Sequence, residues 1–495
     1  MRALALADYA VIVAFFATMV GVGVWFGRRQ KSSDQFFGGD KSMPWWLAGV
    51  SFYMCTFSAL AFVMYSALAY KFGLVPVTVS WGLVPAIFLG AQFTAVRWRR
   101  VARTSPLEFI ARRYGDAMRQ GLVWLGIPMR VLDDAMKLLA IGTVVCVGLG
   151  FPLRLAIVAS GAIVILYTFL GGLKATLVAD FIQFLVLFSV VLSLPLFCLE
   201  RVGGFASFVD RAPEGFFSWT AGKYTWTYMI VLFFISLVNR CTSWSLVQRY
   251  YSTKSEADAK KVGYLVAFLL FVGPPLFFFP AMAARVFLPG MDMTDATAMN
   301  GVYATVCRAV LPVGMIGLVI AAMFSATMSS LAGDFNAVAS VITNELFGAG
   351  GRGGRRSEGS KLVLARLATI FVGGLVIALA FVMRAVQGAD DLLNVANKMF
   401  SVFVPPIALP TVVGLLVPRV SRRAGLCGLL AGIAVGVVVF AVGGWFPGLR
   451  EMTTMTPITF AVTTLGLALG TRYLPDSSAE RADIEEFFKR ANTPS

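Results

Sequence analysis

The sequence predicts an all-α polytopic membrane protein with about thirteen transmembrane helices. Of its 495 residues, 58% are hydrophobic and 14% are charged. The mean hydropathy of +0.78 is far above that of a soluble globular protein. Apolar runs long enough to cross a bilayer, which takes about 20 residues, follow one another with glycine, proline and charged residues between them.

Hydropathy and the positions of glycine and proline set the expected limits of these helices to within a few residues. The expected spans are residues 7–27, 44–70, 74–97, 120–147, 152–171, 176–199, 226–248, 262–286, 311–344, 362–385, 391–417, 425–446 and 454–471. An odd number of spans places the two termini on opposite sides of the membrane. The first apolar run has no basic n-region and no small-residue cleavage site, so we expect a retained helix.

Lysine and arginine are distributed unequally between the connections. About 28 lie in one set of connections and the tail, and about 10 lie in the opposite set. Cytoplasmic loops close to spans carry the excess of positive charge in membrane proteins. We therefore expect an inner (cell) membrane protein with its amino terminus outside and its carboxyl tail in the cytoplasm. The same distribution accounts for the net charge of +16 without a nucleic-acid partner.

The composition excludes several kinds of chemistry. The chain has no histidine, and therefore no imidazole to bind a metal or to act as a general base. Its six cysteines lie in or beside apolar segments without C-x-x-C spacing, which is typical of small buried side chains. No nucleophile with a neighbouring base and no pair of catalytic carboxylates is recognisable, so we do not expect an enzyme.

One expected helix, within residues 311–347, has small and hydroxylated residues in the middle of its apolar run. Ala326, Ser329 and Ser330 are spaced i, i+3 and i+4, so they share one face of a helix at bilayer depth. That face offers oxygens to a small hard cation. Serine and alanine are also common wherever membrane helices pack closely, so a cation site requires a second helix with free backbone carbonyls opposite.

Ionisable residues inside the expected spans are candidates for a substrate or ion pathway. They are the cations Arg130, Lys137, Arg240 and Lys398 and the carboxylates Asp133, Asp134, Asp180 and Asp334. Asp133 and Lys137 are spaced i, i+4 and can instead neutralise each other. Arg130 lies near the end of a span, from which we expect its side chain to reach the membrane interface.

Five stretches, in the expected order, resemble the sodium/solute symporter family, which includes bacterial sodium-coupled sugar, proline and sialic acid carriers. They are DQFFGGDKSMPWWL (34–47), TSPLEFIARRYG (104–115), GGLKATLVADFIQ (171–183), QRYYSTKSEA (248–257) and the opening helix. The resemblance extends from residue 7 to residue 420. Each stretch is weakly specific alone, and their order together with the number of spans makes the combination specific.

The resemblance implies two five-helix repeats of inverted topology, each with a first helix that is broken at its middle. Those first helices are residues 44–70 and 226–248. The implied domains are a first transmembrane helix with a cytoplasmic loop (1–43), the first repeat (44–199), an extracellular loop (200–225), the second repeat (226–417), two peripheral transmembrane helices (418–472) and a cytoplasmic tail (473–495).

The family pattern implies a sodium site shared by two helices. Ala326, Ser329 and Ser330 stand where relatives bind Na+ through one carbonyl and two hydroxyls. The two remaining ligands are backbone carbonyls of the first broken helix, and they fall on Met54 and Phe57. Carbonyl ligands tolerate a change of side chain, so methionine and phenylalanine do not argue against the site.

A second sodium site is less well matched. Asp180 corresponds to an acidic residue that lies close to the common ion and, in some members, binds a second one. Those members have two further hydroxyls where this chain has Ala332 and Gly333, so we do not expect a second sodium of that kind. Asp334 is near enough to substitute, or it forms a salt bridge or faces the cytoplasmic vestibule.

The resemblance also implies the residues of a solute pocket. Asp133 falls where sugar carriers have an asparagine and sialic acid carriers an arginine, and Asn397 falls where sugar carriers have a glutamine. The other candidate solute-binding residues are Thr56, Ser58, Ser80, Trp81, Lys137, Arg240 and Lys398. Asp133 suits sugar hydroxyls or an amine, whereas Arg240 and Lys398 favour a carboxylate, so the charge of the solute stays open.

Together these features predict a secondary active transporter that couples inward sodium flow to uptake of a small organic solute by alternating access. A sugar or sugar-derived solute is favoured, and a carboxylate or amino acid is the alternative. A non-transporting membrane sensor with the same fold is a remote alternative, and no selectivity-filter repeat supports a channel. The expected partners are Na+, the solute and the lipid bilayer, without nucleic acid or an obligate protein partner.

Overall fold

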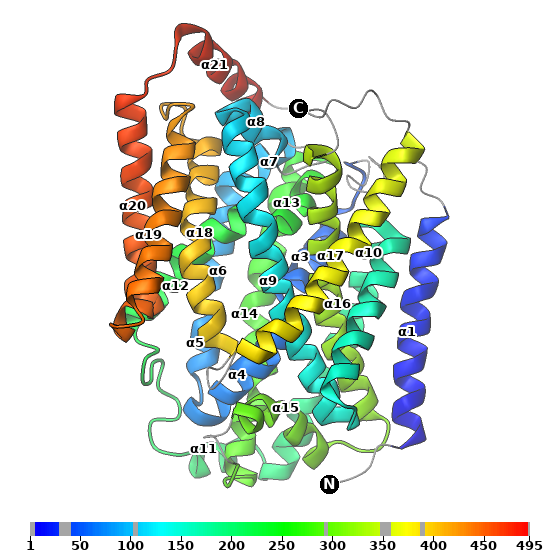
Figure 1. Cartoon of the computed structure of the whole chain (residues 1–495). Coiled ribbons are helices and arrows are strands. Elements are labelled where there is room, and N and C mark those ends of the chain that lie inside the picture. Colours follow the sequence, from blue (N-terminus) through cyan, green and yellow to red (C-terminus); the bar gives the residue numbers. More distant parts are fainter. Residues whose placement is uncertain are drawn as a thin grey trace.

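The computed structural model describes residues 5–28, 41–101, 107–291, 296–346, 358–386 and 392–493. Over these ranges the protein is a bundle of helices, most of which run along one common direction (Figure 1). The described residues form no strand, and two isolated bridges join Met43 to Thr253 and Ala221 to Tyr224. The predicted all-α class is therefore confirmed.

The helices follow one another through short connections. In chain order they are α1 (Leu6–Gly27), α3 (Trp45–Thr56), α4 (Ala59–Phe72), α5 (Val75–Trp81), α6 (Leu83–Gly90), the π-helical turn η2 (Ala91–Ala95), α7 (Val96–Val101), α8 (Glu108–Tyr114), α9 (Asp116–Leu149), α10 (Leu153–Val202), α11 (Phe205–Arg211), α12 (Trp226–Thr242), α13 (Trp244–Tyr251), α14 (Glu256–Phe287), α15 (Ala296–Val310), α16 (Met315–Val341), the π-helical turn η3 (Ile342–Leu346), α17 (Glu358–Val386), α18 (Leu392–Leu416), α19 (Ala424–Val442), the 3₁₀ turn η4 (Pro447–Arg450), α20 (Met452–Tyr473) and α21 (Ser478–Asn492).

Nine helical segments of the described residues are long and apolar enough to cross a membrane, or ten if the bent pair α12 and α13 forms one span. Helix α9 is not among them, and its 34 residues include charged side chains midway along it. Helix α10 has 50 residues, and a straight helix of that length would be about 75 Å long, more than twice the thickness of a bilayer core. Its backbone breaks at Gly172 (φ 57°, ψ −169°), between the two spans that the sequence predicts there.

Helix α16 lies at the centre of the bundle. It is the most buried of the candidate spans, with 89% of its most apolar stretch inside the protein, and it packs against α1, α3, α9, α10 and α17. Close contact with α1 requires Gly317, because a Cβ there would lie 2.3 Å from the carbonyl oxygen of Asp8. The polar residues in the middle of α16 therefore face other helices and not lipid.

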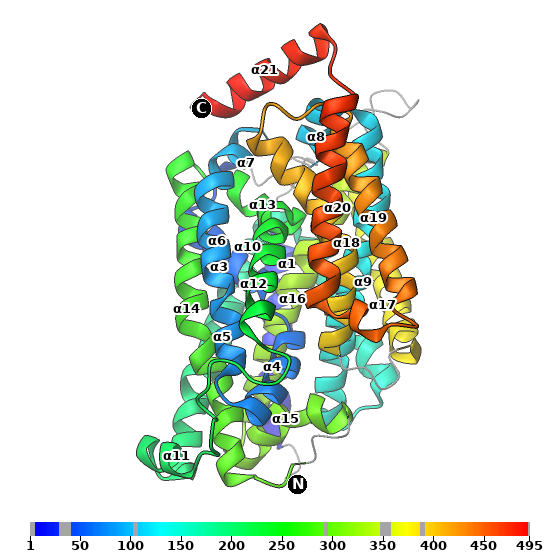
Figure 2. The ribbon, with the colours of Figure 1, turned by 90° about the vertical axis from the view of Figure 1, so that its left-hand side faces the viewer.

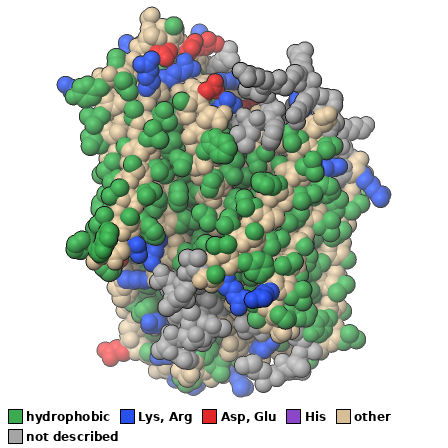
Figure 3. Space-filling view, in the orientation of Figure 1, with side chains coloured by type: hydrophobic (Ala, Val, Ile, Leu, Met, Phe, Trp, Pro, Cys, Tyr) green, Lys and Arg blue, Asp and Glu red, His purple; other side chains and the backbone are tan. Residues whose placement is uncertain are grey.

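Charged side chains gather at the two ends of the bundle. Figure 3 shows a broad hydrophobic belt between them on the face that it presents. Helices α7, α8 and α21, which belong to segments that the sequence predicts to be cytoplasmic, lie at one end, and α11 and α15 lie at the other (Figure 1; Figure 2). The glycine- and arginine-rich loop at 348–357 and most of the loop at 28–41 lie outside the described residues.

Both helices that are predicted to be broken are interrupted. Helix α3 ends at Thr56, the backbone is extended at Phe57 (φ −104°, ψ 152°) and Ser58 (φ −155°, ψ 169°), and α4 continues from Ala59. Helix α12 ends at Thr242, and α13 starts two residues later with a bend of 55° between the two axes. Each break removes helical partners from a few backbone groups in the middle of the bundle.

Candidate functional site

The break between α3 and α4 lies directly against α16. The backbone N–H of Ala59 donates to Thr327 Oγ1 at 2.9 Å. On the other side of the break, the thiol of Cys55 donates to the carbonyl oxygen of Ser329 at 3.3 Å and lies 3.6 Å from its hydroxyl. The structure therefore brings together the two segments that the sequence assigns to one sodium site.

All five predicted sodium ligands lie in the protein interior. Met54, Ala326 and Ser329 are fully buried, and Phe57 and Ser330 are nearly so. The Met54 carbonyl accepts a hydrogen bond from the Phe57 N–H at 3.2 Å, a tight turn that ends α3. A carbonyl oxygen has two lone pairs, so this bond leaves acceptor capacity for a cation.

Asp180, on α10, is held beside this break by a buried network. The hydroxyl of Ser51 donates to Asp180 Oδ2, and Arg249 Nη2 lies 3.7 Å from the same oxygen. Arg249 also donates to Ser51 Oγ at 3.1 Å, to the Ser245 carbonyl at 2.6 Å and to Cys55 Sγ at 3.1 Å. The network connects α3, α10 and α13, so it fixes the first half of the broken helix to two neighbours.

The second oxygen of Asp180 is available to a cation. Asp180 Oδ1 is buried and has no hydrogen-bond partner among the described residues. A buried carboxylate oxygen without a partner is costly, and a cation nearby removes the cost. The donor set around the break, made of carbonyls, serine hydroxyls and this carboxylate, is the oxygen set that a hard cation prefers.

The packing around Gly333 explains in part why this position, which follows the serine pair, carries no hydroxyl. A Cβ at this position would lie 3.0 Å from Cys55 Sγ and 3.2 Å from Arg249 Nη2. Both atoms belong to the network around Asp180, which leaves no room for a larger residue unless they move. A side chain at this position would therefore require Cys55 and Arg249 to shift by a few tenths of an ångström.

A cavity of about 210 Å³ opens beside the broken helix. Pockets for drug-sized ligands measure roughly 300–1,000 Å³, so this cavity is suited to a smaller solute. Its wall comes from the α3–α4 break and from α4, α5, α6, α9, α12, α13, α14, α16, α18 and α20, and it includes several polar side chains. Ser330 and Phe57 of the predicted sodium site line the same cavity.

Most of the predicted solute-binding residues line this cavity. They are Thr56, Ser58, Ser80, Asp133, Lys137, Arg240 and Asn397. Two do not. Trp81 stacks on Phe271 and donates its indole N–H to the Phe271 carbonyl at 2.8 Å, and Lys398 lines a separate hollow of about 320 Å³.

The two hollows meet at a contact between α12 and α18. Asn397 Nδ2 donates to the hydroxyl of Tyr228 at 3.3 Å, and both residues line both hollows. This contact therefore separates the inner cavity from a second hollow, which also contains Lys223 and Arg450. No sequence pattern points to Tyr228, because it lies 169 residues from Asn397.

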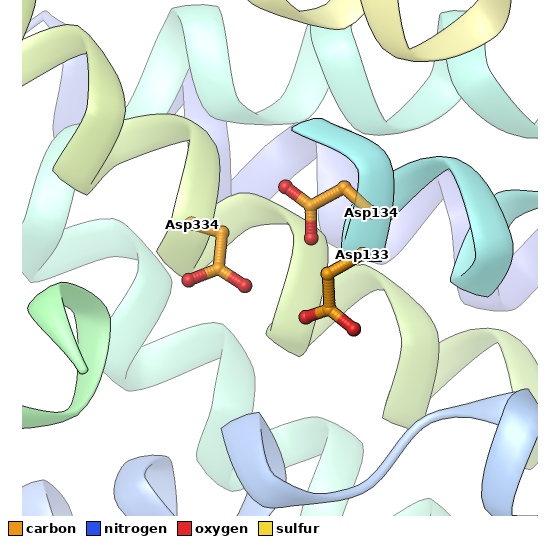
Figure 4. A group of neighbouring side chains, drawn as sticks. All are labelled: Asp133, Asp134 and Asp334. Atoms are coloured by element: carbon orange, nitrogen blue, oxygen red, sulfur yellow. The ribbon is translucent and has the colours of Figure 1, made fainter. Parts of the chain in front are cut away.

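Three carboxylates converge on Lys137 in the cavity wall. Asp133 and Asp134 come from α9 and Asp334 comes from α16 (Figure 4). Lys137 Nζ lies 2.9 Å from Asp133 Oδ2, 2.9 Å from Asp134 Oδ1 and 2.8 Å from Asp334 Oδ2. The expected pairing of Asp133 with Lys137 is present, and it is part of a larger cluster that links α9 to α16.

Two sequence expectations about arginines are wrong. Arg130 does not reach the membrane interface, because it lines the cavity with Nη1 3.8 Å from Asp334 Oδ1. Arg249 directly follows the expected span 226–248 and would lie in a cytoplasmic loop, but it belongs to α13 and its side chain is fully buried beside Asp180. Arg249 belongs to the QRYYSTKSEA stretch, and no sequence pattern paired it with Asp180.

Charges around the cavity are balanced in number. The carboxylates of Asp133, Asp134 and Asp334 are matched by the cations of Arg130, Lys137 and Arg240. Arg240 stands apart from the cluster and has no hydrogen bond or ion pair with another described residue, although the charge of Asp133 acts on it. The cavity wall therefore presents hydroxyls, an amide, a carboxylate and one guanidinium to a bound solute.

Comparison with known proteins fits this arrangement. The profile of the sodium:solute symporter family matches residues 36–432. The chain belongs to this family. The sodium/sialic acid symporter NanT of Aliivibrio fischeri is 26% identical to this symporter over 445 residues, which is 86% of each chain. The sodium/glucose cotransporter of Vibrio parahaemolyticus is 28% identical over 374 residues, 69% of this chain and 68% of the relative.

Solved structures share the fold of this symporter. A Na+-coupled sialic acid symporter, solved in a substrate-bound outward-open state, matches with a TM-score of 0.81 and 21% identity. That match covers 95% of this chain and 98% of the solved one. The nucleobase–cation symporter Mhp1 in a closed conformation matches with a TM-score of 0.56 and 17% identity, over 92% of this chain and 99% of that one.

Proposed function

We propose that this symporter couples inward sodium flow to the uptake of a sugar or sugar-derived solute by alternating access. The observation that carries the proposal is the contact of the α3–α4 break with Ser329 on α16, beside a small polar cavity. A break at that place offers carbonyl oxygens to a cation and polar side chains to a solute on its two sides.

Sodium acts in this proposal by joining two helices. It binds to the carbonyls of Met54, Phe57 and Ala326 and to the hydroxyls of Ser329 and Ser330, with Asp180 close by. Holding α3 against α16 shapes the neighbouring wall of the cavity at Thr56 and Ser58. The affinities for sodium and solute are then coupled, and the coupling is reciprocal.

The sodium gradient is sufficient to drive accumulation. One positive charge that crosses a potential of 100 mV contributes about 2.3 kcal/mol, and a tenfold sodium gradient contributes about 1.4 kcal/mol. The sum of about 3.7 kcal/mol corresponds to an accumulation of about 500-fold for a neutral solute. Cavity residues then release the solute when the bundle opens to the other side.

A net-neutral solute with several hydroxyls suits the charge balance of the cavity. We assign solute contacts to Thr56, Ser58, Ser80, Asp133, Arg240 and Asn397. Asp133 accepts hydrogen bonds from hydroxyl groups and Asn397 both donates and accepts. Lys137 lines the cavity and orients Asp133. Trp81 and Lys398 lie outside this cavity and act from there.

A carboxylate or amino acid is the second candidate for the solute. Arg240 favours it, because its guanidinium lines the cavity without an ion pair among the residues that the structure describes. A carboxylate on the solute would supply that pair. Replacing Arg240 by glutamine distinguishes the candidates, since the transport of an acidic solute should fall far more than that of a neutral one.

The wider architecture follows the family. We propose thirteen transmembrane helices, with residues 44–199 and 226–417 as inverted repeats, 1–43 before them, an extracellular loop at 200–225, two peripheral helices at 418–472 and a tail at 473–495. In this arrangement the amino terminus is outside the cell membrane and the tail is cytoplasmic. The end of the bundle that carries α7, α8 and α21 then faces the cytoplasm.

The serine pair provides the test of this function. Ser329→Ala combined with Ser330→Ala removes two oxygens of the sodium site while keeping a helical sequence of similar size. We expect the variant to insert and fold, and to lose sodium-dependent solute uptake in proteoliposomes at least tenfold. Ser325→Ala on the same helix serves as the matched control. Sodium-dependent uptake retained by the double variant would contradict the assignment.

A further inference from the structure

The three carboxylates beside Lys137 form an arrangement that is usual for a bound cation. One oxygen of each lies within 4.8 Å of the others, and all three side chains are buried. A simple ion pair requires one carboxylate for one ammonium. Here two helices bring three carboxylates to the same nitrogen, and the two contributing segments are 197 residues apart (Figure 4).

The ammonium of Lys137 occupies the position that a metal ion would take. It lies at 2.8–2.9 Å from one oxygen of each carboxylate. The ammonium donates hydrogen bonds to Asp134 Oδ1 and Asp334 Oδ2, and it forms an ion pair with Asp133 Oδ2. These three contacts match the three N–H donors that an ammonium group has. The other oxygens of Asp134 and Asp334 are buried and have no hydrogen-bond partner among the described residues, so the cluster has more acceptor capacity than one ammonium uses.

The charge of the cluster has to be compensated at this position. Three carboxylates form ion pairs with two cations, Lys137 and Arg130, which leaves the cluster itself a formal charge of −1. Arg240 balances this charge across the whole cavity without an ion pair to the cluster. Without the ammonium the formal charge would be −2 in a buried place. Uncompensated charge of that kind is strongly unfavourable in a membrane protein, so a cation between the carboxylates or a proton on one of them has to offset it.

The cluster is next to the proposed sodium site. Asp334 follows Ser330 by one helical turn on α16, and Ser330, Asp334 and Lys137 line the same cavity. One turn of α16 therefore offers hydroxyls to an exchangeable cation, and the next turn contacts a cation that is part of the chain. The two positions carry the same sign of charge and lie on the same side of the cavity.

We propose that the ammonium of Lys137 is a resident cation that permanently fills a three-carboxylate site, so that the symporter binds and couples a single sodium ion. This inference rests on the proposed sodium-coupled function. The side chain supplies a second positive charge to the site without exchange with solvent. Removing the amine would leave an open site of carboxylate oxygens, to which a small inorganic cation binds.

Binding of radioactive sodium to the purified full-length protein in detergent tests this inference with sodium as the only ligand. We expect one site in the native protein and none after Ser329→Ala with Ser330→Ala. Lys137→Met should bind two sodium ions, and the same change combined with the serine pair should bind one. Lys137→Arg keeps a cation at the position, and it should bind one sodium ion as the native protein does.

A compensated variant separates the site from its charge. In Lys137→Met with Asp334→Asn, the remaining carboxylates and Arg130 keep the formal charge of the native cluster. One of the three carboxylates that would bind a cation is lost. We expect this variant to fold in the absence of sodium and to bind one sodium ion. If the Lys137→Met variant unfolds in low sodium, high sodium should restore its folding, because the ion replaces the ammonium.

The outcomes distinguish this inference from the proposed function. Two sodium ions bound by the native protein, or one bound by a folded Lys137→Met variant, would overturn the inference and leave sodium coupling intact. Failure of Lys137→Met to fold at any sodium concentration would also overturn it. A native protein that binds no sodium would contradict the proposed function, and a site gained by Lys137→Met would then still support the resident cation.

Discussion

Polar side chains in the middle of the bundle are paired in small groups, and each group joins helices that are distant in the sequence. Asp180, Ser51 and Arg249 join α10, α3 and α13. Lys137 and Asp334 join α9 and α16. Since burial of a lone charge is so unfavourable in a membrane, these groups determine where each helix can lie.

Removing only one partner of the Asp180–Arg249 pair should destabilise the protein strongly. Arg249→Met leaves the Asp180 carboxylate buried without its cation, and we expect a loss of about 3–5 kcal/mol in the free energy of unfolding. Adding Asp180→Asn should recover most of that loss, because no uncompensated charge remains. Thermal unfolding of the purified protein measures both changes, and a double variant less stable than Arg249→Met would contradict this account of the pair.

Asp133 contacts both the cavity and Lys137, so its replacement separates two roles. Asp133→Asn keeps the shape of the side chain and removes the charge. We expect a changed order of preference among solutes, measured by uptake from a panel of sugars and amines, with sodium affinity altered by less than threefold. If neither quantity changes, Asp133 serves only to hold Lys137.

The residues proposed to bind sodium on α16 could be grouped from the sequence because they lie close together in it. Ala326, Ser329 and Ser330 share one face of one helix, and the family resemblance supplied the partner helix. The contacts of Arg249 and of Asp334 could not be predicted, because they join residues 69 or more positions apart on different helices. A spacing of i, i+4 indicated the Asp133–Lys137 pair, but no spacing within α9 can indicate Asp334.

The helix breaks have different causes, and only some of these causes can be recognised in the sequence. At Gly172 the backbone adopts φ 57°, a conformation that glycine adopts readily, so a glycine between two apolar runs is a direct signal. The break at Phe57 and Ser58 has neither glycine nor proline. It is stabilised by the contact of Ala59 with Thr327 on α16, which is a tertiary contact, and its place came from the family resemblance alone.

The tail helix α21 is attached to the end of the bundle by ring contacts, a hydrogen bond and an ion pair between Asp483 and Arg422 at 3.7 Å. The ring of Phe487 stacks on Phe109, the ring of Phe488 lies under the guanidinium of Arg113, and Arg100 donates to the Ala491 carbonyl at 2.9 Å. The sequence predicted a short helix here and assigned it no role. These contacts tie the tail to α7 and α8.

Removing both aromatic rings of α21 should release the tail and leave the membrane helices intact. We expect Phe487→Ala with Phe488→Ala to increase amide hydrogen exchange across 478–492 at least tenfold, with α16 unchanged. Glu485→Ala, at an exposed position of the same helix, is the matched control. Faster exchange spreading into α16 would show that the tail stabilises the whole bundle.

At the scale of the whole molecule, the structure combines a rigid buried helix with two interrupted ones. Helix α16 carries the serine pair and is held by neighbours on nearly every side, whereas α3 and α12 stop and restart at the depth of the cavity. A bundle of this kind can change its packing around the break while the buried helix keeps the proposed ion ligands in place. Sodium bound across that boundary would link the two parts.

Sodium-driven accumulation tests the central claim most directly. A thermal-shift screen of sugars, sugar acids and amino acids, in sodium and in potassium, first identifies a solute that stabilises the protein only with sodium. Proteoliposomes with an inward sodium gradient should then concentrate that solute above its external level, and collapse of the gradient should release it. Uptake that reaches only equilibrium, or that is the same in potassium, would contradict sodium-coupled transport.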